Sequence, residues 1–317
     1  MTRQFINQLQ AGDTLTDQYV LAEKTMAQKK DGNRYLKLVL SDRTGSIKCV
    51  VWDNVDRIAS QTVSGAVVSV KGHVSDYRGN LQVVIKDMTL VPEDEANPAD
   101  FMPVTERDID QMFERIVALS KSIENSYLKD LFKGFWADDQ LVAQFKRAPA
   151  AKKMHHAYIG GLLEHTLSMA VLADRIAGHY SGIDRDILMA GVLLHDIGKL
   201  REFNYDVAID YSDEGRLVNH IIIGVQMIEE KIKTIPAFPA DIAMLLKHMV
   251  ISHHGSRELG SPEPPKTIEA VMLNCIDEMD SRIQGIREFM AKEDPEENWT
   301  SFHRLLARHF YRGKSVS

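Results

Sequence analysis

Residues 190–199 are Ala190-Gly191-Val192-Leu193-Leu194-His195-Asp196-Ile197-Gly198-Lys199. The run up to Leu194 is apolar or small, which predicts a buried helix, and Gly198 predicts the C-terminal cap of that helix. His195 and Asp196 are therefore placed at a buried helix end. Because a buried carboxylate is costly without a partner, this pair predicts further polar groups around it.

Two other apolar segments supply such groups. His165 lies in the amphipathic stretch 162–170, on the same helical face as Met169 and Leu172. Asp277 lies in the apolar stretch 271–280. A single buried histidine is more often a hydrogen-bonded core residue than a ligand, but polar groups on three separate apolar helices need a shared explanation.

A divalent metal ion explains all of these groups together. The side chains of His165, His195, Asp196 and Asp277 could surround a cation at about 2.0–2.2 Å, and the ion would neutralise the buried acids. Imidazole and carboxylate ligands without thiolate fit Mn²⁺, Mg²⁺, Co²⁺, Fe²⁺ or Zn²⁺. We take Mn²⁺ as the first expectation, although these residues alone do not choose among the five ions.

The front of the chain has a different pattern. From Tyr19 to Val91 apolar residues alternate with polar ones, and turn residues at 41–45 and 76–80 interrupt the alternation. This period of two predicts about five short strands that form a small antiparallel β-barrel. The OB-fold is the leading candidate for such a barrel.

Aromatic and basic side chains on these strands predict a nucleic-acid-binding surface. Single-strand binding needs exposed rings for stacking on bases and cations for phosphates. The alternative is that the rings complete a small core. The candidate residues are Tyr35, Lys37, Lys48, Trp52, Tyr77 and Arg78, with Lys71 nearby.

Residues 92–103 contain three prolines and four acidic residues, which predicts a linker. Beyond it the apolar residues follow a helical spacing, as in Ile109, Met112 and Ile116. The sequence therefore predicts a multi-domain chain, with a barrel domain at residues 1–91 and an all-α domain at residues 104–317.

The amino-acid composition excludes several classes of protein. With 44% hydrophobic and 26% charged residues, the chain is neither disordered, fibrous nor membranous. No apolar run could span a bilayer and no signal peptide is evident, so we expect a cytoplasmic protein. The net charge of −7 divides into +3 for residues 1–91 and −10 for residues 92–317. Cys49 and Cys275 both lie in apolar segments, which predicts buried free thiols.

The order His165, His195-Asp196, Asp277 resembles the H…HD…D ligand set of the HD-domain superfamily of metal-dependent phosphohydrolases. The HD dipeptide alone is weak evidence, but Leu-Leu-His-Asp-Ile-Gly-Lys with the ordered upstream His and downstream Asp is specific. The resemblance implies an HD-type fold for the all-α domain.

Further histidines extend this resemblance. His220 and the pair His253-His254 are similar to the extra histidines with which some HD proteins bind a second metal, so the chain would hold one or two ions. The alternative is structural: His220 caps a helix, and His253-His254-Gly255 ends one.

The whole arrangement is similar to the YhaM-type 3′→5′ exoribonucleases. The similarity covers the barrel, the stretch 153–166, the HD motif and the block Ser252-His253-His254-Gly255. It implies that the barrel holds single-stranded RNA or DNA while the HD domain removes nucleotides from the 3′ end. One departure is the stretch Leu273-Asn274-Cys275 before Asp277, where many relatives carry a histidine, so an auxiliary ligand or hydrogen-bond partner would be absent.

The expected chemistry is hydrolysis of a phosphodiester by water activated at the metal. We expect Asp196 to be catalytic, together with Lys199, whose ammonium group would bind a phosphate oxygen. A solvated cation at the helix end is the alternative role for Lys199. His156 and Tyr158, which precede the first ligand helix, are weaker candidates for substrate contact.

Two other functions compete with the exonuclease. One is an HD phosphohydrolase that acts on a small nucleotide, for which a barrel is unnecessary. The other is a nucleic-acid-binding regulatory factor whose HD domain is structural. The expected partner is single-stranded RNA or DNA, and we expect no binding to membranes. The sequence does not decide whether the protein forms a homo-oligomer, because no surface stripe identifies an interface.

Overall fold

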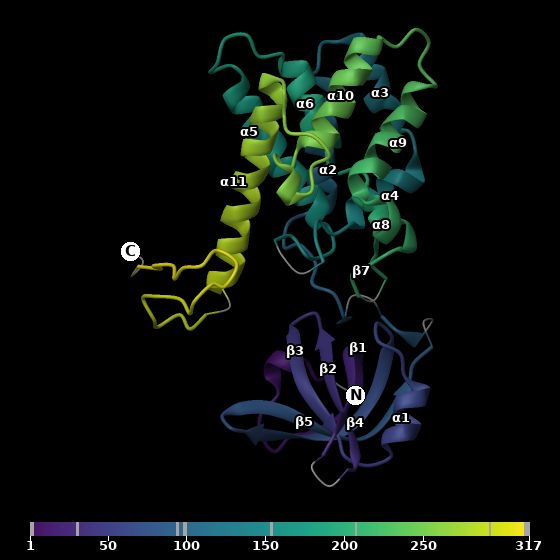
Figure 1. Cartoon of the computed structure of the whole chain (residues 1–317), viewed down its shortest axis with the longest axis vertical. Coiled ribbons are helices and arrows are strands. Elements are labelled where there is room, and N and C mark those ends of the chain that lie inside the picture. Colours follow the sequence, from purple (N-terminus) through teal and green to yellow (C-terminus); the bar gives the residue numbers. More distant parts are fainter. Residues whose placement is uncertain are drawn as a thin grey trace. The chain divides into compact units, whose positions relative to one another are not determined.

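Figure 1 shows the computed structural model of the chain, which divides into two units. Met1–Val104 and Asn204–Asp210 form the first unit, and Thr105–Phe203 and Tyr211–Ser317 form the second. The structure describes residues 3–29, 32–92, 95–97, 100–152, 155–206, 208–291 and 293–313. Residues 153 and 154 of the segment 153–166, and residues 93, 94, 98 and 99 of the predicted linker, lie outside the described residues.

The first unit contains the closed barrel that the sequence predicts. Its strands close in the order β1-β2-β3-β5-β4, and α1 (Val55–Gln61) joins β3 to β4 (Figure 1). The strands are β1 Thr14–Gln28, β2 Arg34–Asp42, β3 Gly45–Val51, β4 Val67–Tyr77 and β5 Asn80–Leu90.

One pairing differs from the antiparallel expectation. Strands β3 and β5 run parallel, with Lys48 opposite Gln82. Parallel strands need a crossover connection, which α1 and β4 provide. Helix α1 was not predicted, because it is short and follows directly on a strand-like run.

The two predicted turns are present and have local causes. The carboxylate of Asp42 is buried and accepts hydrogen bonds from the backbone N–H groups of Thr44 and Ile6, each at 2.7 Å. Arg78 and Gly79 both have positive φ, at 57° and 78°. That conformation suits the tight two-residue turn between β4 and β5.

Beyond residue 104 the described chain is mainly helical, with two short strands, β6 Phe203–Asn204 and β7 Asp210–Tyr211. The predicted all-α domain does not extend to the C-terminal end of the described residues, because residues 293–313 form no helix and contain only turns and two isolated bridges, Trp299 with Tyr311 and His303 with Arg308. The described helices are α2 Ile109–Lys121, α3 Ser126–Trp136, α4 Asp139–Arg147, α5 Gly161–Ala177, α6 Arg185–Leu194, α7 Lys199–Glu202, α8 Asp213–Val218, α9 His220–Ile232, α10 Ala240–Ser252 and α11 Ile268–Ala291. Helices α5, α6, α10 and α11 pack together around the buried HD segment.

Gly198 has a different role from the predicted cap. Its φ is −65°, so it does not adopt the left-handed conformation of a C-terminal cap, and it precedes α7. A Cβ atom at this position would lie 2.0 Å from the carbonyl oxygen of His220 and 2.6 Å from the nitrogen of Gly224. Glycine is therefore required because α9 approaches the backbone here.

Some details of the sequence analysis change. Part of the predicted linker is packed, since Phe101 is buried with Val20, Val67 and Val91, and Ala208 packs against the same cluster.

The expectation of two buried thiols was wrong for one of them: Cys49 is buried, whereas Cys275 is exposed. Among the described residues, no helix is both long and apolar enough to cross a membrane.

Candidate metal centre and nucleic-acid interface

The polar groups predicted from the sequence meet where several helices of the second unit begin or end. His195 follows the last residue of α6, His220 is the first residue of α9, and His253 follows the last residue of α10. His165 and Asp277 come from the interiors of α5 and α11. The apolar helices thus carry the side chains into one buried cluster.

Asp196 lies at the centre of this cluster. Its Oδ2 atom is 3.3 Å from Nε2 of His195 and 3.8 Å from Nε2 of His165. The same His165 nitrogen is 3.4 Å from Oδ1 of Asp277. His165, His195 and Asp277 could therefore hold one ion, with Asp196 beside them.

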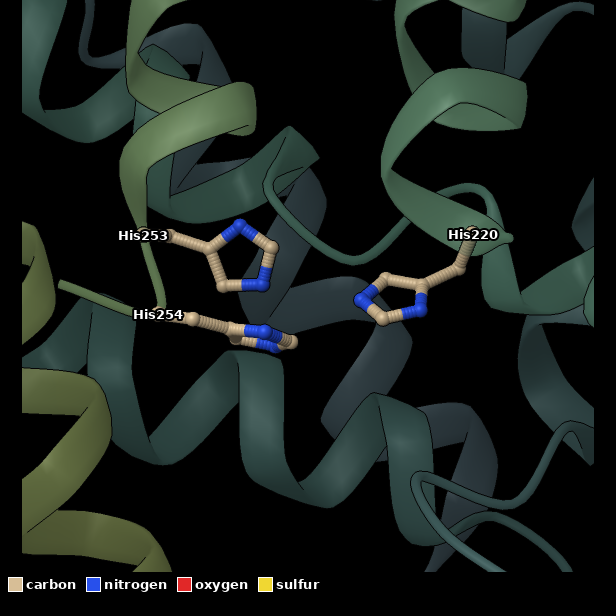
Figure 2. Close-up of side chains that lie close together, drawn as sticks. All are labelled: His220, His253 and His254. Carbon is tan, nitrogen blue, oxygen red and sulfur yellow. The ribbon is translucent and has the colours of Figure 1, made fainter. Parts of the chain in front are cut away.

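The second oxygen of Asp196 faces another histidine group. Its Oδ1 atom is 3.6 Å from Nε2 of His220 and 3.6 Å from Nε2 of His253. Figure 2 shows the ring of His220 directed from α9 toward the rings of His253 and His254, which follow α10. Two candidate metal positions thus lie on either side of one carboxylate.

These separations suit shared metal ions. Two atoms that each bind one ion at about 2.1 Å lie about 3.0–4.2 Å apart, depending on the angle at the ion. All five distances given above fall within that range.

The histidine tautomers also fit. In each of four rings the Nδ1 atom faces an oxygen acceptor: Asp280 Oδ2 for His165 at 2.8 Å, Val192 O for His195 at 2.8 Å, Glu202 Oε1 for His220 at 2.9 Å and Val250 O for His253 at 2.6 Å. An acceptor at Nδ1 keeps the proton there and leaves a lone pair on Nε2. The Nε2 atoms are the ones that face the aspartates.

Unsatisfied atoms give the test of whether a metal fits. Among the described residues, five buried side-chain atoms of the cluster have no hydrogen-bond partner. Leaving a buried polar atom unpaired costs about 1–3 kcal/mol, and the convergence of these atoms on one place fits a shared metal ion. They are Nε2 of His195, His220 and His253, Oδ1 of Asp196 and Nδ1 of His254.

The charges in the cluster are strongly perturbed. Burial raises the pKa of Asp196, but Lys199 and His195 outweigh burial and hold that pKa well below its usual range. Burial lowers the pKa of Lys199, yet the Asp196 carboxylate, 2.6 Å from its Nζ, leaves it raised. Burial lowers the pKa of His253 and brings that of His254 to about 3. By contrast, Asp277 and Asp280 outweigh burial and raise the pKa of His165 to about 9. Neutral imidazoles and ionised carboxylates are the forms that bind metals, so His165 would release a proton when an ion binds.

Asp280 is a functional candidate that the sequence analysis missed. It bonds to His165, accepts a hydrogen bond from Ser168 and lies 3.2 Å from Nε2 of His156. In sequence it resembles any acidic residue on a helix. Only its spacing of three residues from Asp277, which places both on one side of α11, could have indicated a shared role.

His156 and Tyr158 extend the network away from the cluster. Nδ1 of His156 is 2.8 Å from the Tyr158 hydroxyl, which donates to Glu164. His156 is buried and neither residue lines the cleft, so the structure does not support the weaker prediction of substrate contact. His155 lines the cleft instead, and burial lowers its pKa to about 4.

An open cleft of about 1120 Å³ gives access to the cluster. Asp196, Lys199 and Asp277 reach its wall, together with His220 and His254. Asn274 lines it as well and donates a hydrogen bond to the carbonyl of His253 at 2.8 Å. A hydrogen-bond partner is therefore present within the stretch Leu273-Asn274-Cys275, where one was expected to be absent.

The barrel has a groove of its own, of about 870 Å³. The rings of Tyr35 and Trp52 stack with centroids 4.8 Å apart, and the ammonium of Lys29, which the sequence analysis did not single out, lies 4.6 Å from the Trp52 ring. Lys71 is not among the lining residues. All six nucleic-acid-binding candidates line this groove: Tyr35, Lys37, Lys48, Trp52, Tyr77 and Arg78.

Comparison with known proteins agrees with an OB-fold barrel in the first unit and an HD domain in the second. Residues 162–282 match the HD domain family and residues 20–91 match the OB-fold nucleic acid binding domain family. The chain is 34% identical to the 3'-5' exoribonuclease YhaM of Geobacillus sp. (strain WCH70), over 93% of this chain and 91% of that protein. The chain belongs to the YhaM family of 3'-5' exoribonucleases.

A second YhaM-family exoribonuclease, from Bacillus subtilis (strain 168), is 32% identical over 93% of this chain and 94% of its own length. YhaM-family membership and the HD domain together imply dependence on a divalent metal ion. The histidine and aspartate groups that could hold such an ion are present.

Proposed function

We propose that this YhaM-family chain is a metal-dependent 3′→5′ exonuclease that hydrolyses single-stranded RNA to mononucleotides. The observation that carries the proposal is the convergence of five unsatisfied buried atoms in one cluster, of which Asp196, His220 and His254 line an open cleft. A histidine core that served only for packing would be hydrogen-bonded throughout. The relatives named above are exoribonucleases, which supplies the substrate class.

The proposed metal is Mn²⁺, with two ions in each chain. His165, His195, Asp196 and Asp277 would hold the first, and Asp196 with His220, His253 and His254 would hold the second. The carboxylate ligands and the lack of thiolate suit Mn²⁺, which prefers oxygen donors over sulfur donors. When bound, such ions lower the pKa of water and polarise phosphoryl oxygens.

The chain's own residues orient these groups. The carboxylate of Asp196 faces both candidate positions through its two oxygens, which is why we assign it the central catalytic role. Lys199 lines the cleft beside Asp196, so its ammonium group is placed to bind a phosphate oxygen of the substrate. Asp280 holds the His165 ring through Nδ1 and is a positioning residue.

The barrel is proposed to hold the single strand. The stacked pair of Tyr35 and Trp52 offers an aromatic surface on which bases stack, and Lys37, Lys48 and Arg78 border the same groove. Stacking is tolerant of sequence, because every base has an aromatic face. We therefore expect the barrel to bind single strands with little sequence preference. We assign capture of the strand to residues 1–91 and hydrolysis of the strand to residues 104–317.

End-labelled RNA tests this function. Single-stranded RNA labelled at the 5′ end is incubated with protein and Mn²⁺ or Mg²⁺, and the products are followed over time. The proposal expects a ladder that shortens from the 3′ end, and a matching 3′-labelled strand should release labelled mononucleotide at once. Single-stranded DNA of the same sequence measures how far the activity depends on RNA.

The alternatives give other results. Intact RNA with hydrolysis of free nucleotides would support a small-nucleotide phosphohydrolase. Binding without hydrolysis, unchanged in Asp196→Ala, would support a regulatory factor with a structural HD domain. Either result would contradict the exonuclease.

A further inference from the structure

The outer face of α11 carries a stripe of exposed apolar side chains. The α11 stripe consists of Ile268, Val271, Cys275, Met279, Ile283 and the half-buried Ile286. Ile268 is 58% exposed and Ile283 is 52% exposed. Steps of three and four residues keep all six on one helical face. An apolar stripe of this kind marks an interaction surface.

The α11 stripe lies on the side of the helix away from the metal cluster. Leu273 and Ile276 are buried, and Asp277 and Asp280 bond to residues of α5. Helix α11 thus has apolar residues on two faces. The described residues cover the inner face and, at the buried Met272, the beginning of the outer face, and they leave the α11 stripe exposed.

The spacing of the apolar residues in the α11 stripe is the same in both directions along the helix. The steps from Ile268 to Ile286 are three, four, four, four and three residues, symmetric about residue 277. If a second α11 lay antiparallel on a two-fold axis beside residue 277, Ile268 would face Ile286, Val271 would face Ile283 and Cys275 would face Met279. Every apolar side chain would meet another, as a two-fold contact requires.

Charges beside the α11 stripe favour the same arrangement. Glu269 and Arg287 flank it on one side of the helix, at opposite ends, and one oxygen of Glu269 accepts a hydrogen bond from the backbone N–H of Asp184 at 2.9 Å. In the antiparallel pair Arg287 comes within two residues, about 3 Å along the helix axis, of Glu269 in the second copy. A parallel pair would place glutamate beside glutamate and arginine beside arginine, which is unfavourable.

We propose that the α11 stripe is the contact between two copies of this chain, with their α11 helices antiparallel. A nucleic-acid partner suits it poorly, because the flanking Arg282 is paired with Glu278 and residues 92–317 carry a net charge of −10. The proposal does not rest on the proposed exonuclease activity, because the stripe faces away from Asp277.

The association itself is measured by sedimentation equilibrium of the full chain over a range of concentrations. The α11 stripe is about 27 Å long, so the contact is smaller than the standard interface of about 800 Å² per partner, and we expect a reversible dimer. Met279→Asp and Ile283→Asp should each give monomers. Met244→Asp is the matched control, since Met244 is 62% exposed on α10, outside the stripe, and should leave the dimer unchanged.

A monomer at every accessible concentration of the unaltered chain would overturn the proposal. A dimer that survives Met279→Asp and Ile283→Asp would also overturn it. Circular dichroism of each variant shows whether it is folded. If the aspartate variants unfold, charge exchange decides: Arg287→Glu should weaken the dimer and Glu269→Arg with Arg287→Glu should restore it, and failure of that restoration contradicts the antiparallel contact.

Disulfide trapping tests the orientation. Facing positions in packed helices bring Cα atoms to about 5 Å, whereas Cys275 and its own copy would lie about 8 Å apart, beyond the limit of about 7 Å for a disulfide. Mild oxidation of Met279→Cys should therefore give a covalent dimer through Cys275 of the second copy. The unaltered chain and Met244→Cys should not cross-link. Efficient cross-linking of the unaltered chain through Cys275 would exclude the antiparallel arrangement.

Discussion

Asp280 illustrates how much of a metal centre depends on residues that do not bind the ion. It accepts the Nδ1 proton of His165 and is itself held by Ser168 and His156. A carboxylate in this position fixes the ring orientation and raises the basicity of the ligand nitrogen. The sequence patterns predicted His165 and could not predict Asp280, because hydrogen bonding between helices leaves no periodic signal.

Removing the charge of Asp280 should weaken metal binding. We expect Asp280→Asn to lower Mn²⁺ affinity by about 10- to 100-fold, as measured by calorimetric titration, because a neutral amide oxygen is a weaker acceptor for the His165 Nδ1–H and no longer raises the basicity of its Nε2. Asp241→Asn, an exposed change on α10, is the control and should bind Mn²⁺ normally. Unchanged Mn²⁺ affinity in Asp280→Asn would show that Asp280 does not position His165.

The two cysteines differ in reactivity because they differ in burial. Burial raises the pKa of Cys49 to about 12, so at pH 8 it is a protonated thiol inside the barrel. In Cys275→Ser, where Cys49 is the remaining cysteine, we expect no reaction with a thiol reagent until denaturant unfolds the barrel. Reaction in the native state at pH 8 would show that Cys49 is accessible.

At the scale of elements, the periodic patterns predicted both folds because they report which face of a strand or helix is buried. The run of Leu36, Leu38 and Leu40 does face the barrel core. Close backbone approaches leave no such pattern. Gly198 was interpreted as a cap from its place in the sequence, although contact with α9, a partner more than twenty residues away, is what requires glycine there.

Gly198→Ala tests that contact. A Cβ atom 2.0 Å from the His220 carbonyl must push α9 away, which should cost about 1–3 kcal/mol in the free energy of unfolding and should weaken metal binding through His220. Gly178→Ala, whose Cβ would meet nothing within 4 Å, is the matched control. Denaturant unfolding and Mn²⁺ titration measure both effects. Equal stabilities of the two variants would contradict this account of Gly198.

At the scale of the whole molecule, we propose that the first unit binds the single strand and the second unit hydrolyses it. Trp52→Ala removes one ring of the stacked pair and should lower affinity for a long single strand by about 1–3 kcal/mol, or about 5- to 150-fold. Hydrolysis of a dinucleotide should be unaffected. Fluorescence anisotropy and product release measure the two quantities, and Tyr180→Ala, an exposed aromatic of the second unit, is the control. An equal loss on both substrates would contradict the division.

The charge asymmetry along the chain supports this division but could not locate either site. A net charge of +3 on residues 1–91 indicates where phosphates are attracted, yet the groove depends on how β2, β3 and β4 bring Tyr35, Trp52 and Tyr77 together. In the same way, His220 and His253 were predicted as candidates, but only the fold shows that both face one oxygen of Asp196.

The central claim is a metal centre built on both sides of Asp196, and metal stoichiometry tests it most directly. Metal-free protein is titrated with Mn²⁺, and the number of ions bound per chain is counted for the unaltered protein, His254→Ala and Asp196→Ala. We predict two ions in the unaltered protein, one in His254→Ala and none in Asp196→Ala, each variant remaining folded by circular dichroism. Unchanged Mn²⁺ binding in folded Asp196→Ala would contradict the claim.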